Sequence, residues 1–129
     1  MIIGVGTDVI EINRMAKLLT GTTGEKLVRR VLTATENQYA NTNIKRRVEF
    51  IAGRFSVKEA VVKALGCGIG EKVGFQDIEI LPDSAGKPHC HLSHEAIKRL
   101  GLDRRRLQIH VSISHSERTV VSFAVAEAI

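Results

Sequence analysis

The chain has 129 residues, of which 43% are hydrophobic and 26% are charged, proportions that are typical of an ordinary globular domain. Its formal net charge of +5 favours an anionic partner, such as a phosphate group, a nucleic acid or an acidic protein. No stretch reaches the roughly 20 apolar residues that cross a bilayer, the two cysteines are too few for a disulfide scaffold, and no signal peptide is visible. We therefore expect one domain over residues 1–129, located in the cytoplasm, with no membrane partner.

The N-terminal segment predicts a strand followed by a helix. Ile2 to Val5 is expected to form a short strand that ends at Gly6, and Asp8 with Glu11 three residues later has the pattern of a helix capping box. A helix is therefore expected to begin near Val9. Asp8 also stands where a strand leads into a helix, which is a common place for ligand-binding side chains. Two roles of Asp8 therefore remain open, as a helix cap and as a ligand-binding residue.

The middle of the chain predicts helices. A short helix is expected around residues 27–32, and Thr33 with Glu36 repeats the capping pattern at the start of another. The strongest helical signal runs from about Lys45 to Leu65, and Gly66 is a natural stop for it.

The second half changes to the period of strands. Residues 77–81 alternate, residues 82–88 predict a turn, residues 89–92 predict a second strand, and a short helix capped by Ser93 is expected to end near Gly101. Residues 107–114 alternate again and lead through a short connection into residues 119–126, which predicts a β-hairpin with one buried face. Helices early and an antiparallel sheet largely from the C-terminal half make the fold class α+β.

Glu59 is the most informative residue of the long helix. It falls within the narrow apolar stripe of Val48, Ala52, Phe55 and Val62. An ionised carboxylate taken out of water needs a cation or must give up its charge. Lys63, four residues later, is one candidate partner and a bound metal ion is another, so an ordinary helix pair and a metal site both remain open.

Asp8 and Glu59 together indicate more than either does alone. Two carboxylates from separate elements, meeting in an otherwise basic protein, would form a hard-oxygen Mg²⁺ site that a substrate phosphate completes. His115 and Ser116 open the turn of the predicted hairpin, where a histidine and hydroxyls can bind a phosphate monoester or simply face solvent. The histidines close to Cys90 match no zinc-binding spacing.

Three segments of the chain resemble the holo-[acyl carrier protein] synthase family of phosphopantetheinyl transferases. Their order and separation also fit that family, and the likeness spans essentially the whole chain. The segments are Gly6-Thr7-Asp8-Val9-Ile10-Glu11-Ile12-Asn13-Arg14, Phe55-Ser56-Val57-Lys58-Glu59-Ala60-Val61-Val62-Lys63-Ala64-Leu65-Gly66 and Val111-Ser112-Ile113-Ser114-His115.

The resemblance implies a reaction and a set of roles. The enzyme would transfer 4′-phosphopantetheine from coenzyme A to a serine of apo acyl carrier protein, with release of 3′,5′-ADP, to give the holo carrier for fatty acid synthesis. Asp8 and Glu59 would hold Mg²⁺, Lys63 would neutralise phosphate charge, and Glu59 would accept the serine proton. The residues implied for the nucleotide and 3′-phosphate pocket are Arg54, Lys58, Lys63, Gly66, His115 and Ser116.

The resemblance also implies partners. Carrier proteins of this kind are acidic, so Arg14, Arg30 and Arg46 are the candidate residues for docking them. Members of the family form homotrimers with active sites at subunit interfaces. Cys67 departs from the family pattern, which usually has Thr at that place, and neither proposed metal ligand is affected.

Two other functions compete with this one. A basic module that binds RNA would explain the charge, but the sequence has only four Phe and one Tyr for stacking bases, and Glu59 would be left without a role. No nucleic acid partner is therefore expected. The second competitor is a different Mg²⁺-dependent phosphotransferase, or a phosphopantetheinyl transferase whose main substrate is a carrier domain of a large synthase.

Overall fold

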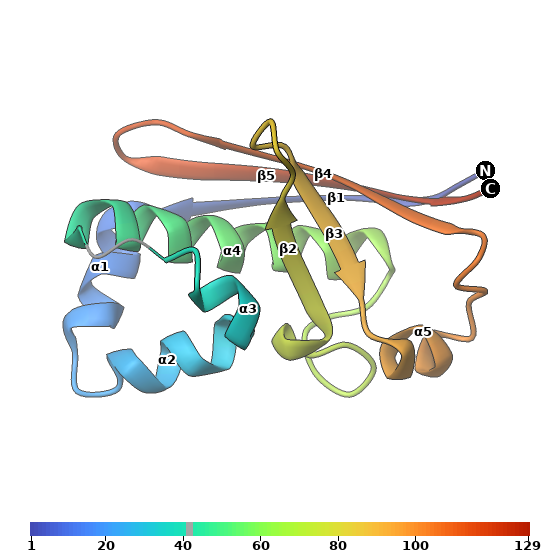
Figure 1. Cartoon of the computed structure of the whole chain (residues 1–129), viewed down its shortest axis with the longest axis horizontal. Coiled ribbons are helices and arrows are strands. Elements are labelled where there is room, and N and C mark those ends of the chain that lie inside the picture. Colours follow the sequence, from blue (N-terminus) through green and yellow to red (C-terminus); the bar gives the residue numbers. More distant parts are fainter. Residues whose placement is uncertain (41–42) are drawn as a thin grey trace.

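In the computed structural model, which describes residues 1–40 and 43–129, helices cover one face of an antiparallel sheet (Figure 1). The three-stranded sheet has the order β1-β5-β4, so the first strand of the chain pairs with the last, and β2 and β3 form a separate hairpin that lies against β4. The α+β prediction is confirmed. The strands are β1 (Ile2–Glu11), β2 (Ile78–Pro82), β3 (Pro88–Leu92), β4 (Leu107–His115) and β5 (Thr119–Ala128). The helices are α1 (Ile12–Thr20), α2 (Gly24–Val31), α3 (Ala34–Asn37), α4 (Ile44–Ala64) and α5 (His94–Leu100), with a 3₁₀ turn η1 (Phe75–Asp77).

Most predicted elements form where they were expected. The long helix is α4, capped at its start by the Asn43 side chain, and the C-terminal hairpin is the β4-β5 pair. Thr33 and Glu36 form the predicted capping box at α3, and Ser93 caps α5, which ends at Gly101 in the left-handed conformation that favours glycine.

The predicted helix start near Val9 is wrong. β1 continues through Asp8, which pairs with Ser122, and on to Glu11, and α1 begins only at Ile12 without a side-chain cap. The reason is that β5 offers this segment a continuous antiparallel ladder, which satisfies its backbone groups better than one side-chain cap does. Asp8 is therefore not a helix cap, and its side chain is free for another use.

Small residues bring β1 and α4 into direct contact. A Cβ atom added at Gly6 would lie 1.8 Å from the carbonyl oxygen of Ala60, and one added at Gly4 would lie 2.1 Å from that of Ala64. Any side chain at these two positions would push the strand off the helix. Since side chains alternate along a strand, Asp8 continues the row of Gly4 and Gly6 and also faces α4.

The opposite face of the sheet is uncovered in a single chain. Val5, Val9 and Phe123 are more than half exposed there, at 61%, 63% and 51%. The core lies on the other face, along both halves of α4. None of the helices in the described ranges combines the length and the apolar character needed to span a membrane.

Candidate functional site

Asp8, Glu59 and Lys63 meet where β1 runs alongside α4. The Lys63 Nζ donates to the Thr7 carbonyl oxygen at 2.9 Å and lies 3.3 Å from Asp8 Oδ1, while the Ser56 hydroxyl lies 3.5 Å from the Asp8 carbonyl oxygen. Glu59 stands one helical turn before Lys63 on the same side of α4. The close packing at Gly4 and Gly6 is what brings the helix near enough for these contacts.

Glu59 is half-buried, and the charge of a second carboxylate, that of Asp8, acts on it. Burial, and after it the negative charge of Asp8, raise the pKa of Glu59, whereas the Lys63 ammonium opposes the rise. A single lysine therefore faces two carboxylates. That arrangement leaves negative charge that a cation would stabilise.

The pair fits Mg²⁺ better than a metal that requires a full set of protein ligands. No three His, Cys, Asp or Glu residues in the described parts of the chain form a group able to hold a metal ion. Mg²⁺ usually retains several waters and binds through one or two carboxylates together with substrate phosphate. Asp8 and Glu59 supply two such oxygen ligands.

A second concave site lies at the other edge of the sheet. It is a groove of about 330 Å³ between the N-terminal half of α4, the β2-β3 hairpin and the end of β4. Arg54 and Arg46 give it positive character, His115 adds an imidazole, and Glu49 is its one acidic side chain. The other lining residues, which are apolar or small, are Phe50, Gly53, Pro82, Gly86, Pro88 and Ile113.

Arg54 is the most confined cation in this groove. Its side chain is only 11% exposed, and its guanidinium carbon lies 4.4 Å from the centre of the Phe50 ring. The Arg54 Nε is buried and has no hydrogen-bond partner. Burial lowers the pKa of Arg54, and the charge of Glu36 offsets part of that effect. An anion in the groove would meet a guanidinium that is incompletely compensated.

Lys58 does not line this groove, so its contact with a nucleotide stays a prediction. Its side chain is fully buried, and Lys58 Nζ donates to Glu36 Oε1 at 2.6 Å, to the Val31 carbonyl at 2.6 Å and to the Phe75 carbonyl at 3.0 Å. All three ammonium protons are thus used inside the protein. This partner could not be predicted from the sequence, because Glu36 lies 22 residues away from Lys58.

The remaining candidate residues are spread over the molecule. Gly66 follows the end of α4, far along the helix from the groove, and has a φ of +78°. The Ser116 hydroxyl forms a hydrogen bond with the Thr119 hydroxyl within the β4-β5 turn. Arg14 and Arg30 are exposed on α1 and α2, whereas Arg46 lies in the groove wall. Within one chain, Arg54, Arg46 and His115 are therefore the basic residues that the groove brings together.

The two sites are separated by α4 within one chain. Asp8 on β1 and Ile113 on β4 both lie opposite Ser122 of β5, so their backbones are about 10 Å apart across the sheet. Helix α4 packs on the inner face between them, with the carboxylates at its β1 side and the groove at its β4 side.

Sequence reasoning missed Glu36 as part of the site. Its capping pattern was visible, but nothing in the pattern showed that the carboxylate would be fully buried and would lie 4.0 Å from Arg54. Phe50, which packs on Arg54, was also missed because apolar helix residues ordinarily signal core.

Comparisons with known proteins agree with the geometry. A family model described as the 4′-phosphopantetheinyl transferase superfamily matches residues 4–125. The holo-[acyl-carrier-protein] synthase of Anoxybacillus flavithermus is 43% identical over 128 residues, which cover 98% of this chain and 97% of the relative.

Solved structures point to the same family. The holo-[acyl-carrier-protein] synthase of Neisseria meningitidis superposes with a TM-score of 0.84 at 34% identity, covering 98% of this chain and 99% of its own. A holo-(acyl-carrier-protein) synthase from Bacillus anthracis in complex with CoA (3′,5′-ADP) gives a TM-score of 0.80 at 38% identity, covering 100% and 99%.

Proposed function

The chain belongs to the 4′-phosphopantetheinyl transferase superfamily, and from that premise we propose that it transfers 4′-phosphopantetheine from coenzyme A to a serine of apo acyl carrier protein. It acts in the cytoplasm and supplies holo carrier for fatty acid synthesis. The observation that carries this proposal is the meeting of Asp8, Glu59 and Lys63 between β1 and α4 in a chain of net charge +5.

In this reaction the serine Oγ attacks the β-phosphorus of coenzyme A. A new P–O bond forms to the serine, the bond from that phosphorus to the oxygen bridging the two phosphates breaks, and 3′,5′-ADP leaves with the bridging oxygen. There is little covalent work for the protein to do, so positioning and neutralisation of charge are the main demands.

The β1–α4 residues meet these demands. Asp8 and Glu59 hold Mg²⁺, which when bound neutralises charge on the diphosphate. Lys63 places its ammonium beside the same phosphates, since its Nζ already lies 3.3 Å from Asp8 Oδ1. Glu59 accepts the proton of the attacking serine, and its raised pKa brings it closer to the range that suits a general base.

The groove at the other sheet edge binds the nucleotide end. Arg54 and His115 take the 3′-phosphate, and the apolar surface of Phe50 and Ile113 suits a base. Arg46 contributes to the same wall. The acidic carrier docks on the exposed basic side chains of the early helices, of which Arg14 and Arg30 are the leading members.

Within one chain, α4 separates the two carboxylates from the groove. A complete active site therefore needs two copies of the chain. The uncovered sheet face, with Val5, Val9 and Phe123 exposed, is the surface that joins them. We therefore propose a homotrimer in which the Asp8–Glu59 site of one copy meets the Arg54–His115 groove of its neighbour.

The test is a direct assay of the product. The chain is incubated with coenzyme A, Mg²⁺ and an apo acyl carrier protein, and the carrier is expected to gain the mass of phosphopantetheine, as measured by intact-mass spectrometry. A carrier whose acceptor serine is replaced by alanine, and a reaction with EDTA, are the controls. Absence of an adduct on apo acyl carrier protein, or an adduct only on a carrier domain from a large synthase, would contradict the proposed acceptor.

A further inference from the structure

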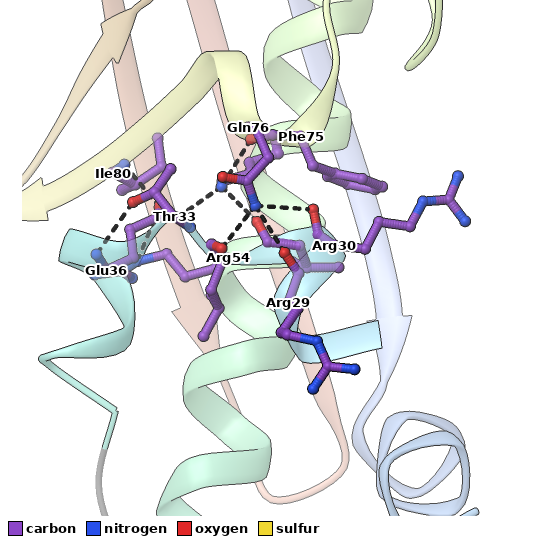
Figure 2. A network of polar contacts seen from close by, with 11 residues as sticks. Arg29, Arg30, Thr33, Glu36, Arg54, Phe75, Gln76 and Ile80 are labelled. Carbon is purple, nitrogen blue, oxygen red and sulfur yellow. Dashed lines mark hydrogen bonds and ion pairs between the residues drawn. The ribbon is translucent and has the colours of Figure 1, made fainter. Parts of the chain in front are cut away.

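Glu36 is the centre of a buried polar network that the proposed reaction leaves without a role. Its carboxylate comes from the four-residue helix α3 and has no exposed surface. Glu36 Oε1 accepts hydrogen bonds from the Thr33 N–H at 2.8 Å and from Lys58 Nζ at 2.6 Å, and Glu36 Oε2 accepts one from the Ile80 N–H at 2.8 Å. Figure 2 shows Thr33 and Glu36 at the start of α3 close to Ile80 on β2.

Neighbouring backbone groups fix the frame of this network. The Gln76 side-chain amide donates to the carbonyl groups of Arg29, Arg30 and Leu32, which closes the C-terminal end of α2 beside the network. Carbonyls at a helix end otherwise lack partners. Glu36 therefore stands in a rigid setting and its carboxylate has a fixed direction.

The charges in the network do not balance. One carboxylate, Glu36, faces two confined cations, Lys58 and Arg54. Lys58 is fully satisfied by its three hydrogen bonds. Arg54 is not, because its buried Nε has no hydrogen-bond partner and lies 4.0 Å from Glu36 Oε2. The uncompensated positive charge is thus located on Arg54, at the wall of the groove.

We propose that Glu36 is a positioning residue for the coenzyme A 3′-phosphate: it holds the inner edge of the Arg54 guanidinium so that the outer edge faces the groove beside His115. This inference rests on the proposed function. Phe50 supports one face of the guanidinium, and Glu36 attracts its Nε side, so few orientations are left open. An arginine oriented before binding loses less conformational entropy when it binds a phosphate.

The two possible roles of Glu36 predict different results. If Glu36 serves only Lys58, then replacing both members of that pair by uncharged side chains of similar size should leave ligand binding intact, since a buried ion pair can often be replaced in this way. If Glu36 also orients Arg54, the same replacement should weaken binding of the phosphate that Arg54 contacts.

The experiment measures the dissociation constants of coenzyme A and of 3′-dephospho-coenzyme A by calorimetry, for the wild-type chain and for E36Q/K58M, R54Q and E36Q/K58M/R54Q. We expect E36Q/K58M to bind coenzyme A about tenfold more weakly while its affinity for the dephospho form is unchanged. We expect the triple variant to bind like R54Q, because the effect of Glu36 acts through Arg54. E25Q, which removes the exposed Glu25–Arg47 ion pair, is the control and should bind both ligands normally.

Several outcomes would overturn the proposal. If E36Q/K58M bound coenzyme A with wild-type affinity, Glu36 would serve only as the structural partner of Lys58. An equal loss for both ligands, or a further loss when E36Q/K58M is added to R54Q, would show that its effect does not pass through Arg54. A wild-type chain that binds neither ligand would instead contradict the proposed function.

A measurement on the wild-type chain decides the matter if E36Q/K58M does not fold. In the protein without ligand, NMR should show a single sharp Arg54 Nε–H signal that exchanges slowly with water, since this group is buried and lies 4.0 Å from Glu36 Oε2. Rapid exchange, or averaging that shows a freely rotating guanidinium, would overturn the proposal.

Discussion

Glu59 combines two functions in the proposed reaction, and one substitution can separate them. Glu59→Gln keeps the size of the side chain and one oxygen ligand but removes the negative charge and the ability to accept a proton. We expect kcat to fall at least about 100-fold, the lower end of what a general base contributes. The measurement is steady-state transfer to apo acyl carrier protein at saturating coenzyme A and Mg²⁺.

Glu95→Gln provides the matched control, because Glu95 is exposed in the first turn of α5 and should show wild-type kcat. If Glu59→Gln turned over normally with Mg²⁺ still bound, Glu59 would be a metal ligand only. The serine proton would then have to go to another group.

For single residues, the sequence predicted the chemistry well where the signal was local. Glu59 stood out because a carboxylate broke an apolar stripe, and the structure does place it half-buried with Asp8 and Lys63 for neighbours. For Lys58, only one position away, the sequence did not show the buried partner Glu36, because that residue comes from another helix. A basic side chain near a motif can serve a ligand or a buried carboxylate, and the sequence does not distinguish them.

The close packing of β1 along α4 depends on the absence of side chains at two positions. Gly6→Ala would place a Cβ atom 1.8 Å from the Ala60 carbonyl oxygen, where neither backbone can yield easily. We expect the free energy of unfolding to fall by about 3 kcal/mol, at the upper end for overpacking. Urea denaturation followed by circular dichroism measures it.

Gly68→Ala is the comparison for this prediction. No atom lies within 4 Å of the added Cβ there, and the backbone of Gly68 is not left-handed, so the change should stay within about 0.5 kcal/mol. Equal stability of the two variants would mean that β1 can move away from α4 at little cost.

Asp77 links η1 to α5 and makes that link dependent on pH. Partial burial raises the pKa of Asp77, but hydrogen bonds from the Ser93 hydroxyl and the Gly74 N–H, together with Arg99, outweigh it, so the pKa lies below its ordinary value. The ionised form is therefore favoured by folding. The stability that ionised Asp77 contributes is fully present above the pKa of Asp77 in the unfolded chain, about 3.9. It is lost as the pH falls through the lower pKa of Asp77 in the native protein.

The variant Asp77→Asn should show this dependence directly. At pH 7 we expect it to be about 2 kcal/mol less stable than the wild type, because hydrogen bonds to a charged group are lost. The difference should shrink as the pH is lowered below about 4. A difference that stays constant from pH 7 to pH 3 would show that the charge of Asp77 is not what matters.

The elements of this fold differ in how visible they are in the sequence. Helix α4 and the β4-β5 hairpin were predictable because their periodicity runs over many residues. The length of β1 was not, because Asp8 and Glu11 satisfy a local capping rule and only the distant strand β5 overrides it. The choice between cap and strand depends on a partner more than 100 residues away along the chain.

At the scale of the whole molecule, the sheet accounts for the proposed sharing of the active site between two copies. Its inner face is used by α4, which separates the carboxylates from the groove, and its outer face exposes Val5 and Phe123 to water. Exposed apolar faces of this kind mark interaction surfaces. Alternation in the sequence predicted that one face of the hairpin is buried in the chain, but it did not show that β1 and β5 would expose Val5, Val9 and Phe123 together on the other face of the sheet.

A shared site predicts that two inactive variants repair each other. Glu59→Gln impairs only the carboxylate half, and Arg54→Gln with His115→Ala impairs only the groove half. When equal amounts are mixed and allowed to exchange subunits, half of the carboxylate sites are intact and half of the neighbouring grooves are intact, so about a quarter of the sites should recover wild-type turnover.

This recovery requires that the two halves come from different copies. If a single chain contained the whole site, every site in the mixture would carry one defect, and transfer to apo acyl carrier protein would remain at the level of the separate variants. A mixture assayed before subunits exchange is the control, because it contains the same proteins without mixed oligomers. Activity that rises with exchange time toward a quarter of the wild-type value would therefore establish both the oligomer and the position of its active sites between subunits.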